Sequence, residues 1–469
     1  MTESFFEWVA RFCNRPTSRV TPTTSPASTG LAFGAIGELG HYYRVRDSQL
    51  LRHVHVMGRE GRHDFITHLL RQQAVRGGGF FYLDSSLDLA ALTSFQETGR
   101  EIVCIAPDYA RESVAYNPLS TNDTPELVER AMLVIPSASL PDAAREALRV
   151  FLRVLADAAQ AVGRQVTFHD LGLLLMYASS LDWLRGLLAG NSPEAIAFDK
   201  LKAQWSTESG EWDRHRLLAT FGGAAARLAY FCSGRHHEVL GHASAPDFIS
   251  GAIQNNACVY LGLPRMSKDA HALAFGAMAL REVVDAVSVR ASKPVHSEPP
   301  FLIVVSEVEA LQQADAMLCY LLEKGAAANC IIVFASITDD THELAPPFIR
   351  EGLCADVESM PYGQRVVVTK PLTRRHLPLQ YAAIVHMPGV EAKVAFPAIG
   401  ADASCQPSHK TAPGLSGPPL LDMASRFREF AAEDWAQTSH DEAYVKAASR
   451  VRPLQSGTDS GSSPQQRSA

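Results

Sequence analysis

The chain has 469 residues, which is enough for two or three domains with a substantial core. Hydrophobic residues make up 46% of it and charged residues 20%, as in ordinary globular proteins, and the net charge of −7 gives no general attraction to nucleic acid. No apolar run reaches about eighteen residues, so we expect no membrane-spanning helix. The first residues lack a secretory signal, and the eight cysteines include no C-x-x-C pair. We therefore expect a cytoplasmic protein with free thiols.

The first 30 residues are predicted to form an amphipathic segment and a linker. Apolar side chains recur at helical spacing in residues 4–12, which predicts a short helix that packs on its own domain or docks on a partner or a membrane surface. Residues 15–29 are rich in Pro, Ser and Thr, as linkers are. The folded body is expected to begin near residue 31.

The stretch from His53 to Asp84 has the order of a strand, a loop, a helix and a second strand. We expect the first strand at Val54–Met57, the loop at Gly58–His63, the helix at Asp64–Arg76 and the second strand at Phe80–Leu83. Phosphate-binding loops occur in this β-loop-α-β setting.

The loop keeps glycines of a phosphate-binding loop but lacks its charged and hydroxyl groups. Such a loop needs Gly, four residues and then Gly-Lys-Ser/Thr, so that the lysine neutralises phosphate charge and the hydroxyl holds magnesium. Here His63 takes the place of the second motif glycine, Asp64 that of the lysine and Phe65 that of the hydroxyl. A carboxylate there repels a triphosphate by about 1 kcal/mol in water and more in a dry site. The candidate cofactor-binding residues of this degenerate loop are Gly58, Gly61, Arg62, His63, Asp64 and Phe65.

Further strands alternate with helices along the chain. A helix is expected at 87–99 and a strand at 101–106, then amphipathic helices without a strand from about 124 to 250, then strands at 257–262, 301–305, 330–335, 365–369 and 382–386, with helices at 270–289 and 307–324. This alternation predicts an α/β fold with a mainly parallel, doubly wound sheet that is interrupted by an all-α insertion domain.

The domain boundaries follow from this pattern. We expect the N-terminal segment and linker at 1–30, the two parts of the sheet domain at 31–120 and 253–395, the all-α insertion at 121–252, and a C-terminal extension at 396–469. The extension is expected to be largely disordered, with one helix near 420–435.

Five segments in a fixed order give the chain a family resemblance. They are HVHVMGREG, RGGGFFYLD, YNPLS, VYLGLP and FLIVVSEVEA, within about residues 50–345. With these segments and the helical insertion, the chain resembles the coupling ATPases of type IV secretion and conjugation, the TraD/TraG family. The resemblance implies a RecA-like P-loop NTPase sheet, a hexamer at the bacterial inner membrane, and a role in DNA transfer or protein secretion.

The chain differs from this family at the positions of the family's catalytic and magnesium-binding residues. The family carries Asp-Glu after an apolar strand, where Asp supports magnesium and Glu polarises water, whereas this chain has Ser306-Glu307. Ile337 stands where the family tends to have a glutamine that senses the γ-phosphate. Glu307 is therefore a vestigial Walker B glutamate or, alternatively, a charge at the N-terminus of a helix. With the lysine and the loop hydroxyl also absent, the departures predict a pseudo-ATPase with no cofactor and no confident catalytic residue.

The resulting hypothesis is a non-catalytic, coupling-protein-like component of a bacterial type IV secretion or conjugation system. It would recruit or position substrate and partner proteins, including an active coupling ATPase, within a homo- or hetero-hexamer and with peripheral inner-membrane contact. One alternative is an active DNA- or protein-translocating ATPase that binds ATP and Mg²⁺ in a rebuilt site, with Arg59 or Arg62 replacing the lysine charge. Another is a protein that grips DNA without hydrolysis, against which the acidic net charge weighs.

Three other groups were weighed as sites. Cys232, His236, His237 and His242 cluster in the sequence, but their spacing fits zinc poorly, and we expect no metal site. Arg350 would reach a neighbouring subunit's nucleotide if it lay at a subunit boundary. The basic stretch 370–375 is too short to indicate binding to a phosphate backbone or anionic lipid.

Overall fold

The computed structural model describes most of the chain between residues 30 and 397. The described residues are 30–36, 41–51, 53–58, 61–87, 89–135, 139–231, 236–242, 247–263, 270–292, 299–307, 311, 314–336, 364–368, 380–387 and 390–397. Several expectations fall outside them: the helix at 4–12, Arg59, Cys232, Ile337, Arg350, the stretch 370–375 and the helix near 420–435.

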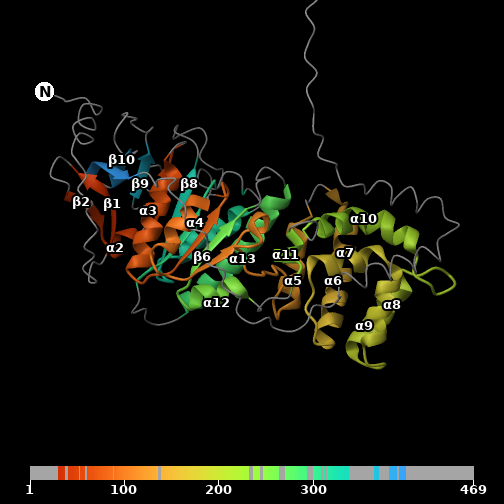
Figure 1. Cartoon of the computed structure of the whole chain (residues 1–469). Helices are drawn as coiled ribbons and strands as arrows, with labels where there is room; N and C mark the ends of the chain where they lie inside the picture. Colours follow the sequence, from red (N-terminus) through yellow and green to blue (C-terminus); the bar gives the residue numbers. More distant parts are fainter. Residues whose placement is uncertain are drawn as a thin grey trace, which may run out of the picture.

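Eleven strands of the described residues form one sheet (Figure 1). In spatial order they are β2 (His41–Val45), β1 (Leu31–Ile36), β11 (Val390–Pro397), β10 (Gln380–Met387), β9 (Gln364–Val368), β3 (Val54–Met57), β8 (Cys330–Ser336), β7 (Phe301–Val305), β4 (Phe80–Asp84), β6 (Cys258–Gly262) and β5 (Ile102–Ile105).

The strands from β9 to β5 all run parallel to their neighbours. Tyr82 of β4, for example, pairs with Val304 of β7 on one side and Tyr260 of β6 on the other. The central strands are buried on both faces, which explains their almost continuous apolar sequences. The predicted α/β fold with a mainly parallel sheet is confirmed.

The other part of the sheet is antiparallel and was not fully predicted. β10 pairs with β9 and β11, β11 pairs with β1, and β1 pairs with β2. Strands were expected at β9 and β10, but β1, β2 and β11 were missed. The reason for β1 is visible in its sequence, LAFGAI, where Gly34 interrupts a short run and gives no alternation to detect.

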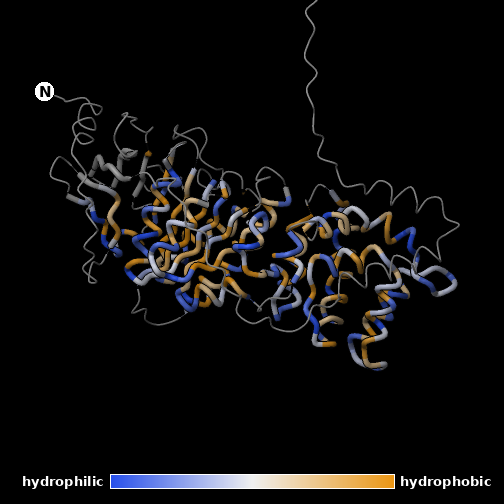
Figure 2. The backbone as a smooth tube through the Cα atoms, in the orientation of Figure 1, coloured by the Kyte–Doolittle hydropathy of each residue, from blue (hydrophilic) through white to orange (hydrophobic). Residues whose placement is uncertain are grey.

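Helices cover both faces of the sheet, as a doubly wound fold requires (Figure 1). On one face, α3 (Arg62–Val75) and α4 (Leu89–Gln96) share a core with Phe80, Tyr82 and Tyr260. On the other face, α13 (Ala270–Ala291) and α14 (Asp315–Lys324) pack against the alternate side chains of the same strands. Figure 2 shows hydrophobic residues concentrated along these central strands.

A run of helices connects β5 to β6. It comprises η1 (Pro107–Tyr109), α5 (Thr124–Leu133), α6 (Asp142–Ala161), α7 (Phe168–Met176), α8 (Ala178–Leu187), α9 (Pro193–Gln204), α10 (Arg214–Tyr230), α11 (His236–Leu240) and α12 (Phe248–Gln254). The helices predicted for this region are therefore present. Its buried side chains join those beneath α13 and α14 in one hydrophobic cluster, so these helices and the sheet share a core.

Helices α6 to α10 of this run lie at the end of the molecule opposite to β1 and β2, whereas α12 lies beside β6 (Figure 1). The boundaries at residues 121 and 252 stay predictions, because the shared core gives no break in packing between the two parts. Among the described residues, no helix combines the length and the apolar character needed to cross a bilayer.

Candidate functional site

The candidate loop lies where several parallel strands end together. Gly58 follows β3, Ser85 follows β4, and Ser306 and Glu307 follow β7. Because β3, β8, β7 and β4 are successive parallel neighbours, these residues lie at one edge of the sheet. In open α/β sheets this carboxyl edge is where ligands bind.

Both loop glycines have backbone conformations that other residues adopt poorly. Gly58 has a φ of 140°, and a Cβ atom on it would come within 2.7 Å of the carbonyl oxygen of Val368. Gly61 has a φ of 73° and precedes the first turn of α3. The two glycines are thus required by the local backbone, whether or not the loop binds phosphate.

Arg62 fills the space between the loop and the end of β7. Only 2% of its side chain is exposed. Nη1 donates to the carbonyl oxygen of Gly58 at 3.2 Å, and Nη2 donates to Oε1 of Glu307 at 3.0 Å. Arg62 and Glu307 were both candidates from the sequence, and the structure brings them together as an ion pair across the site.

His63 links this ion pair to a second set of buried polar groups. Nη2 of Arg62 lies 3.2 Å from Nε2 of His63, and the guanidinium group can only donate to it. Nδ1 lies 3.2 Å from the hydroxyl of Tyr82 and 3.8 Å from Oδ1 of Asp84. His63 therefore acts as a hydrogen-bonding residue at a position where the phosphate-loop motif has glycine.

Asp84 is fully buried and is held by hydroxyl groups. Its Oδ2 accepts from the hydroxyl of Tyr260 at 2.8 Å, and its Oδ1 accepts from Oγ of Ser86 at 2.7 Å. Burial and the nearby carboxylate raise the pKa of Tyr260, so this phenol stays a donor. Asp84 and Tyr260 were not predicted as site residues; the one signal in the sequence was the carboxylate of Asp84 at the end of an apolar strand.

Asp64 and Phe65 occupy the positions of the motif's lysine and hydroxyl residue. Asp64 is half-buried in the first turn of α3, where the helix dipole favours a carboxylate. Phe65 is fully buried and packs edge-on against Phe33, with ring centroids 5.5 Å apart. Neither side chain supplies the chemistry of the residue that it replaces.

Ser306 uses its hydroxyl to connect strands β7 and β4. Its Oγ accepts from the backbone N–H of Ser85 at 2.9 Å and lies 3.1 Å from the carbonyl oxygen of Leu83, to which it donates. The hydroxyl is thus engaged within the protein, at the position where the family has its magnesium-supporting carboxylate.

The expected helix from residue 307 to 324 is described over part of its length. Helix α14 spans Asp315–Lys324, and Glu307 at the end of β7 has a left-handed backbone with a φ of 50°. Residues 308–310 and 312–313 lie outside the described residues, so the alternative interpretation of Glu307 as a charge at a helix N-terminus stays a prediction.

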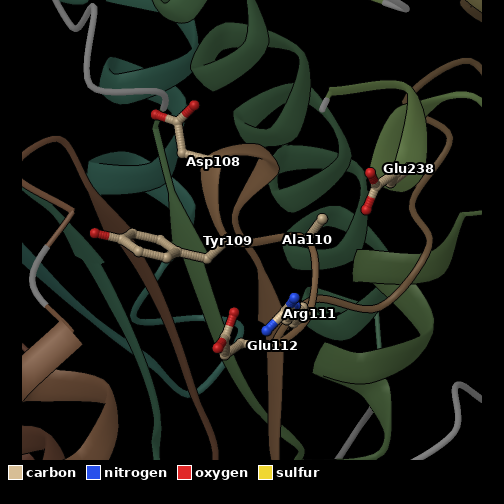
Figure 3. A pocket seen from close by; sticks show the side chains of 6 residues that line it. All are labelled: Asp108, Tyr109, Ala110, Arg111, Glu112 and Glu238. Atoms are coloured by element: carbon tan, nitrogen blue, oxygen red, sulfur yellow. The ribbon is translucent and has the colours of Figure 1, made fainter. Parts of the chain in front are cut away.

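A separate pocket lies at the end of β5, the edge strand of the sheet (Figure 3). It is lined by Asp108, Tyr109, Ala110, Arg111, Glu112 and Glu238. In the sheet order, β8, β7, β4 and β6 separate this strand from β3 and the loop. None of these residues was predicted from the sequence as a site residue.

The histidine cluster around α11 makes local contacts. Nε2 of His236 lies 3.3 Å from Oδ1 of Asp108, and the rings of His237 and His242 have centroids 5.4 Å apart. Within the part of the chain that the structure describes, no group of three or more His, Cys, Asp or Glu side chains is placed to hold a metal ion.

Solved structures with a similar fold come from conjugation and secretion machinery. The bacterial conjugative coupling protein TrwBdeltaN70, in its trigonal form with sulphate, matches with a TM-score of 0.50 and 14% identity, over 82% of this chain and 93% of that chain. Its unbound monoclinic form matches with a TM-score of 0.49 and 16% identity, over 82% and 92%. VirB4 of Thermoanaerobacter pseudethanolicus matches with a TM-score of 0.46 and 12% identity, over 78% and 96%.

No protein-family model and no curated protein sequence matches the chain. At 14% identity, the similarity to TrwBdeltaN70 establishes the fold alone. The resemblance predicted from the sequence is therefore confirmed at the level of the fold: the chain has the fold of the bacterial conjugative coupling protein TrwBdeltaN70.

Proposed function

We propose that this chain is a non-catalytic, coupling-protein-like component of a bacterial type IV secretion or conjugation system. It recruits or positions substrate and partner proteins, and an active coupling ATPase supplies the energy. It works in the cytoplasm with peripheral contact at the inner membrane, within a homo- or hetero-hexamer. The fold supports the general role, and the loop supports the loss of catalysis.

The observation that carries the proposal is the ion pair between Arg62 and Glu307. A catalytic glutamate at the end of this strand would have to polarise a water molecule. Here its carboxylate instead accepts a hydrogen bond from a buried guanidinium group, which also holds the loop through the carbonyl oxygen of Gly58. To admit a nucleotide, the protein would have to break a partly buried, charge-assisted contact worth about 1.5–3 kcal/mol.

The lack of a magnesium ligand supports the same conclusion. A P-loop NTPase holds magnesium with a loop hydroxyl and a carboxylate after the next acidic strand. Phe65 and Ser306 stand at these positions, one buried in the core and the other hydrogen-bonded to Leu83. The described residues of the loop therefore do not fit a magnesium-bound triphosphate.

Calorimetric titration with magnesium-ATP, followed by a phosphate-release assay on the same sample, tests this proposal. We expect no binding heat up to millimolar nucleotide and no phosphate release. Asp64→Lys is an informative variant, because it removes the repelling charge and leaves the Arg62 to Glu307 contact in place; we expect it to stay inactive. Binding with turnover by the unaltered chain would overturn the proposal.

The alternative is an active translocating ATPase with a rebuilt site. It is favoured by two features of the described residues: among them, Nε of Arg62 is buried with no hydrogen-bond partner, and no side chain caps the N-terminus of α3. Both would suit an anion. In that case, magnesium-dependent nucleotide affinity would be measurable and would fall at least tenfold in Arg62→Ala, because the variant removes the charge that replaces the lysine.

A further inference from the structure

A second buried charge cluster lies where the helical run joins the sheet. At its centre is Glu282 of α13, whose side chain is 1% exposed. Its Oε1 accepts from the backbone N–H groups of Ile249 at 2.6 Å and Ser250 at 3.2 Å, and its Oε2 accepts from the hydroxyl of Tyr116 at 2.9 Å.

Glu282 acts as the cap of helix α12. The first N–H groups of a helix have no partner within it, and residue Asp247 at the cap position makes no side-chain cap. The carboxylate of α13 provides the missing acceptor from outside the helix. Helix α12, the last of the helical run before β6, is thereby tied to α13.

Arg130 ties the first helix of the run, α5, to the same point. Its side chain is 1% exposed and lies near four carboxylates. The distances are 3.0 Å to Glu126, 3.3 Å to Asp247, 3.5 Å to Asp285 and 3.9 Å to Glu282.

The cluster has more acidic than basic groups. The second guanidinium group is that of Arg281, which contacts Glu126 at 3.1 Å. Four carboxylates thus face two guanidinium groups among the described residues, and full ionisation leaves an excess of two negative charges. Glu282 and Arg130 are buried at the centre of this group, whereas Asp247, Asp285 and Arg281 are each 43% exposed. Protonation of one carboxyl group relieves part of this excess without removing an acceptor for α12, because a neutral carboxyl group still accepts hydrogen bonds.

We propose that this cluster is a proton-sensitive clamp, which holds both ends of the helical run on α13 more firmly as the pH falls below neutrality. The inference rests on the geometry of the junction and is independent of whether the loop hydrolyses ATP.

The pKa of Glu282 supports the sign of this effect. Burial raises it from the ordinary 4.5 to about 7; Arg130 and the hydrogen bonds from Ser250 and Tyr116 oppose the rise, and Asp247 adds to it. Burial, and then Glu126, raise the pKa of Asp285 as well. A carboxyl group whose pKa is raised on folding contributes stability that is present below its unfolded value and is lost as the pH rises through its folded value. The clamp therefore loosens as the pH rises from about 4.5 to about 7 and changes little above that.

Hydrogen exchange of the amides in Phe248–Gln254 tests the clamp directly, because two of them donate to Glu282. After correction for intrinsic exchange rates, we expect protection to fall about tenfold between pH 6 and pH 9 in the unaltered chain. Glu282→Gln keeps an acceptor but cannot ionise, and should abolish this loss. Glu129→Gln is the matched control: it lies on the same helix as Arg130, is half exposed, and should keep the original profile.

Tyr116→Phe provides a second, directional test. In the unaltered chain, the hydrogen bond from the Tyr116 hydroxyl lowers the pKa of Glu282. Its removal should raise this pKa and move the midpoint of the exchange profile to higher pH. A purely structural role would change the protection level without moving the midpoint. If Glu282→Gln fails to fold, the profiles of the unaltered chain and of Tyr116→Phe decide. Protection that does not change with pH, or a midpoint that Tyr116→Phe does not move, would overturn the proposal.

Discussion

The loop and the junction both bury an arginine against carboxylates, but the balance of charge differs. In the loop, Arg62 meets Glu307 as a single ion pair. At the junction, Arg130 meets four carboxylates, and among the described residues Arg281 is the one other guanidinium group that contacts them. An ion pair with equal charges has little reason to change its protonation near neutral pH, whereas a group with excess negative charge favours protonation of one carboxylate. We call the Arg62 to Glu307 ion pair the lock, because it holds the loop in one arrangement, whereas the junction responds to pH.

The largest effect should come from removing the arginine at the junction. Arg130→Met leaves four carboxylates with Arg281 alone, and we expect it to lower the free energy of unfolding by about 3–5 kcal/mol. Chemical denaturation at neutral pH measures this change. Arg149→Met is the control, because its partner Glu129 is exposed, and it should cost less than about 1 kcal/mol. Equal losses of unfolding free energy in the two variants would mean that Arg130 stabilises the protein no more than an exposed arginine does.

Breaking the ion pair between Arg62 and Glu307 should lower the free energy of unfolding by less, and by different amounts for the two residues. Glu307→Gln leaves a buried guanidinium group with a weaker partner, whereas Arg62→Ala leaves a carboxylate that is 23% exposed and can reach water. A double-mutant cycle of these two changes should give a coupling of about 1.5–3 kcal/mol, measured by denaturant unfolding. A coupling near zero would show that the two side chains do not hold the loop closed.

The loop backbone offers a test of why its glycines are present. Gly58→Ala should destabilise the protein by about 1–3 kcal/mol even without nucleotide, because its Cβ would clash with Val368 and its φ is unfavourable for alanine. Gly186→Ala in α8 is the control: nothing lies within 4 Å of its Cβ position, and alanine should stabilise the helix slightly. Thermal unfolding compares the two; a neutral Gly58→Ala would contradict a backbone role.

The sheet should respond to pH in the opposite direction from the junction. Burial lowers the pKa of His53 to about 4, and its ring connects the carbonyl oxygen of Leu322 to the N–H of Ile332. A histidine whose pKa is lowered on folding destabilises the protein as the pH falls below its unfolded value of 6.5. The free energy of unfolding should therefore fall by about 1–2 kcal/mol less between pH 6.5 and pH 4.5 in His53→Gln than in the unaltered chain. Unfolding curves at both pH values measure it, and an unchanged slope would rule out this histidine as the cause.

The sequence predicted the elements whose patterns are local. The apolar runs of the parallel strands and the amphipathic stripe of α6 placed those elements to within a few residues, because buried strands and helix faces need these side chains wherever they lie in the fold. Strand β1 was missed, since its partners β2 and β11 supply most of its stabilisation and Gly34 hides its pattern.

The sequence by itself determined that the loop lacks the lysine and hydroxyl of a phosphate-binding loop, since a missing functional group is missing in any fold. Only the tertiary structure decided what replaced them. Arg62 and Glu307 are 245 residues apart, and Tyr116 and Glu282 are 166 apart. Their contacts arise because parallel strands bring distant chain segments to one edge and because α13 packs against both ends of the helical run. Such contacts produce no periodic pattern in the sequence, because a contact between two distant residues places no constraint on the residues beside them in the chain.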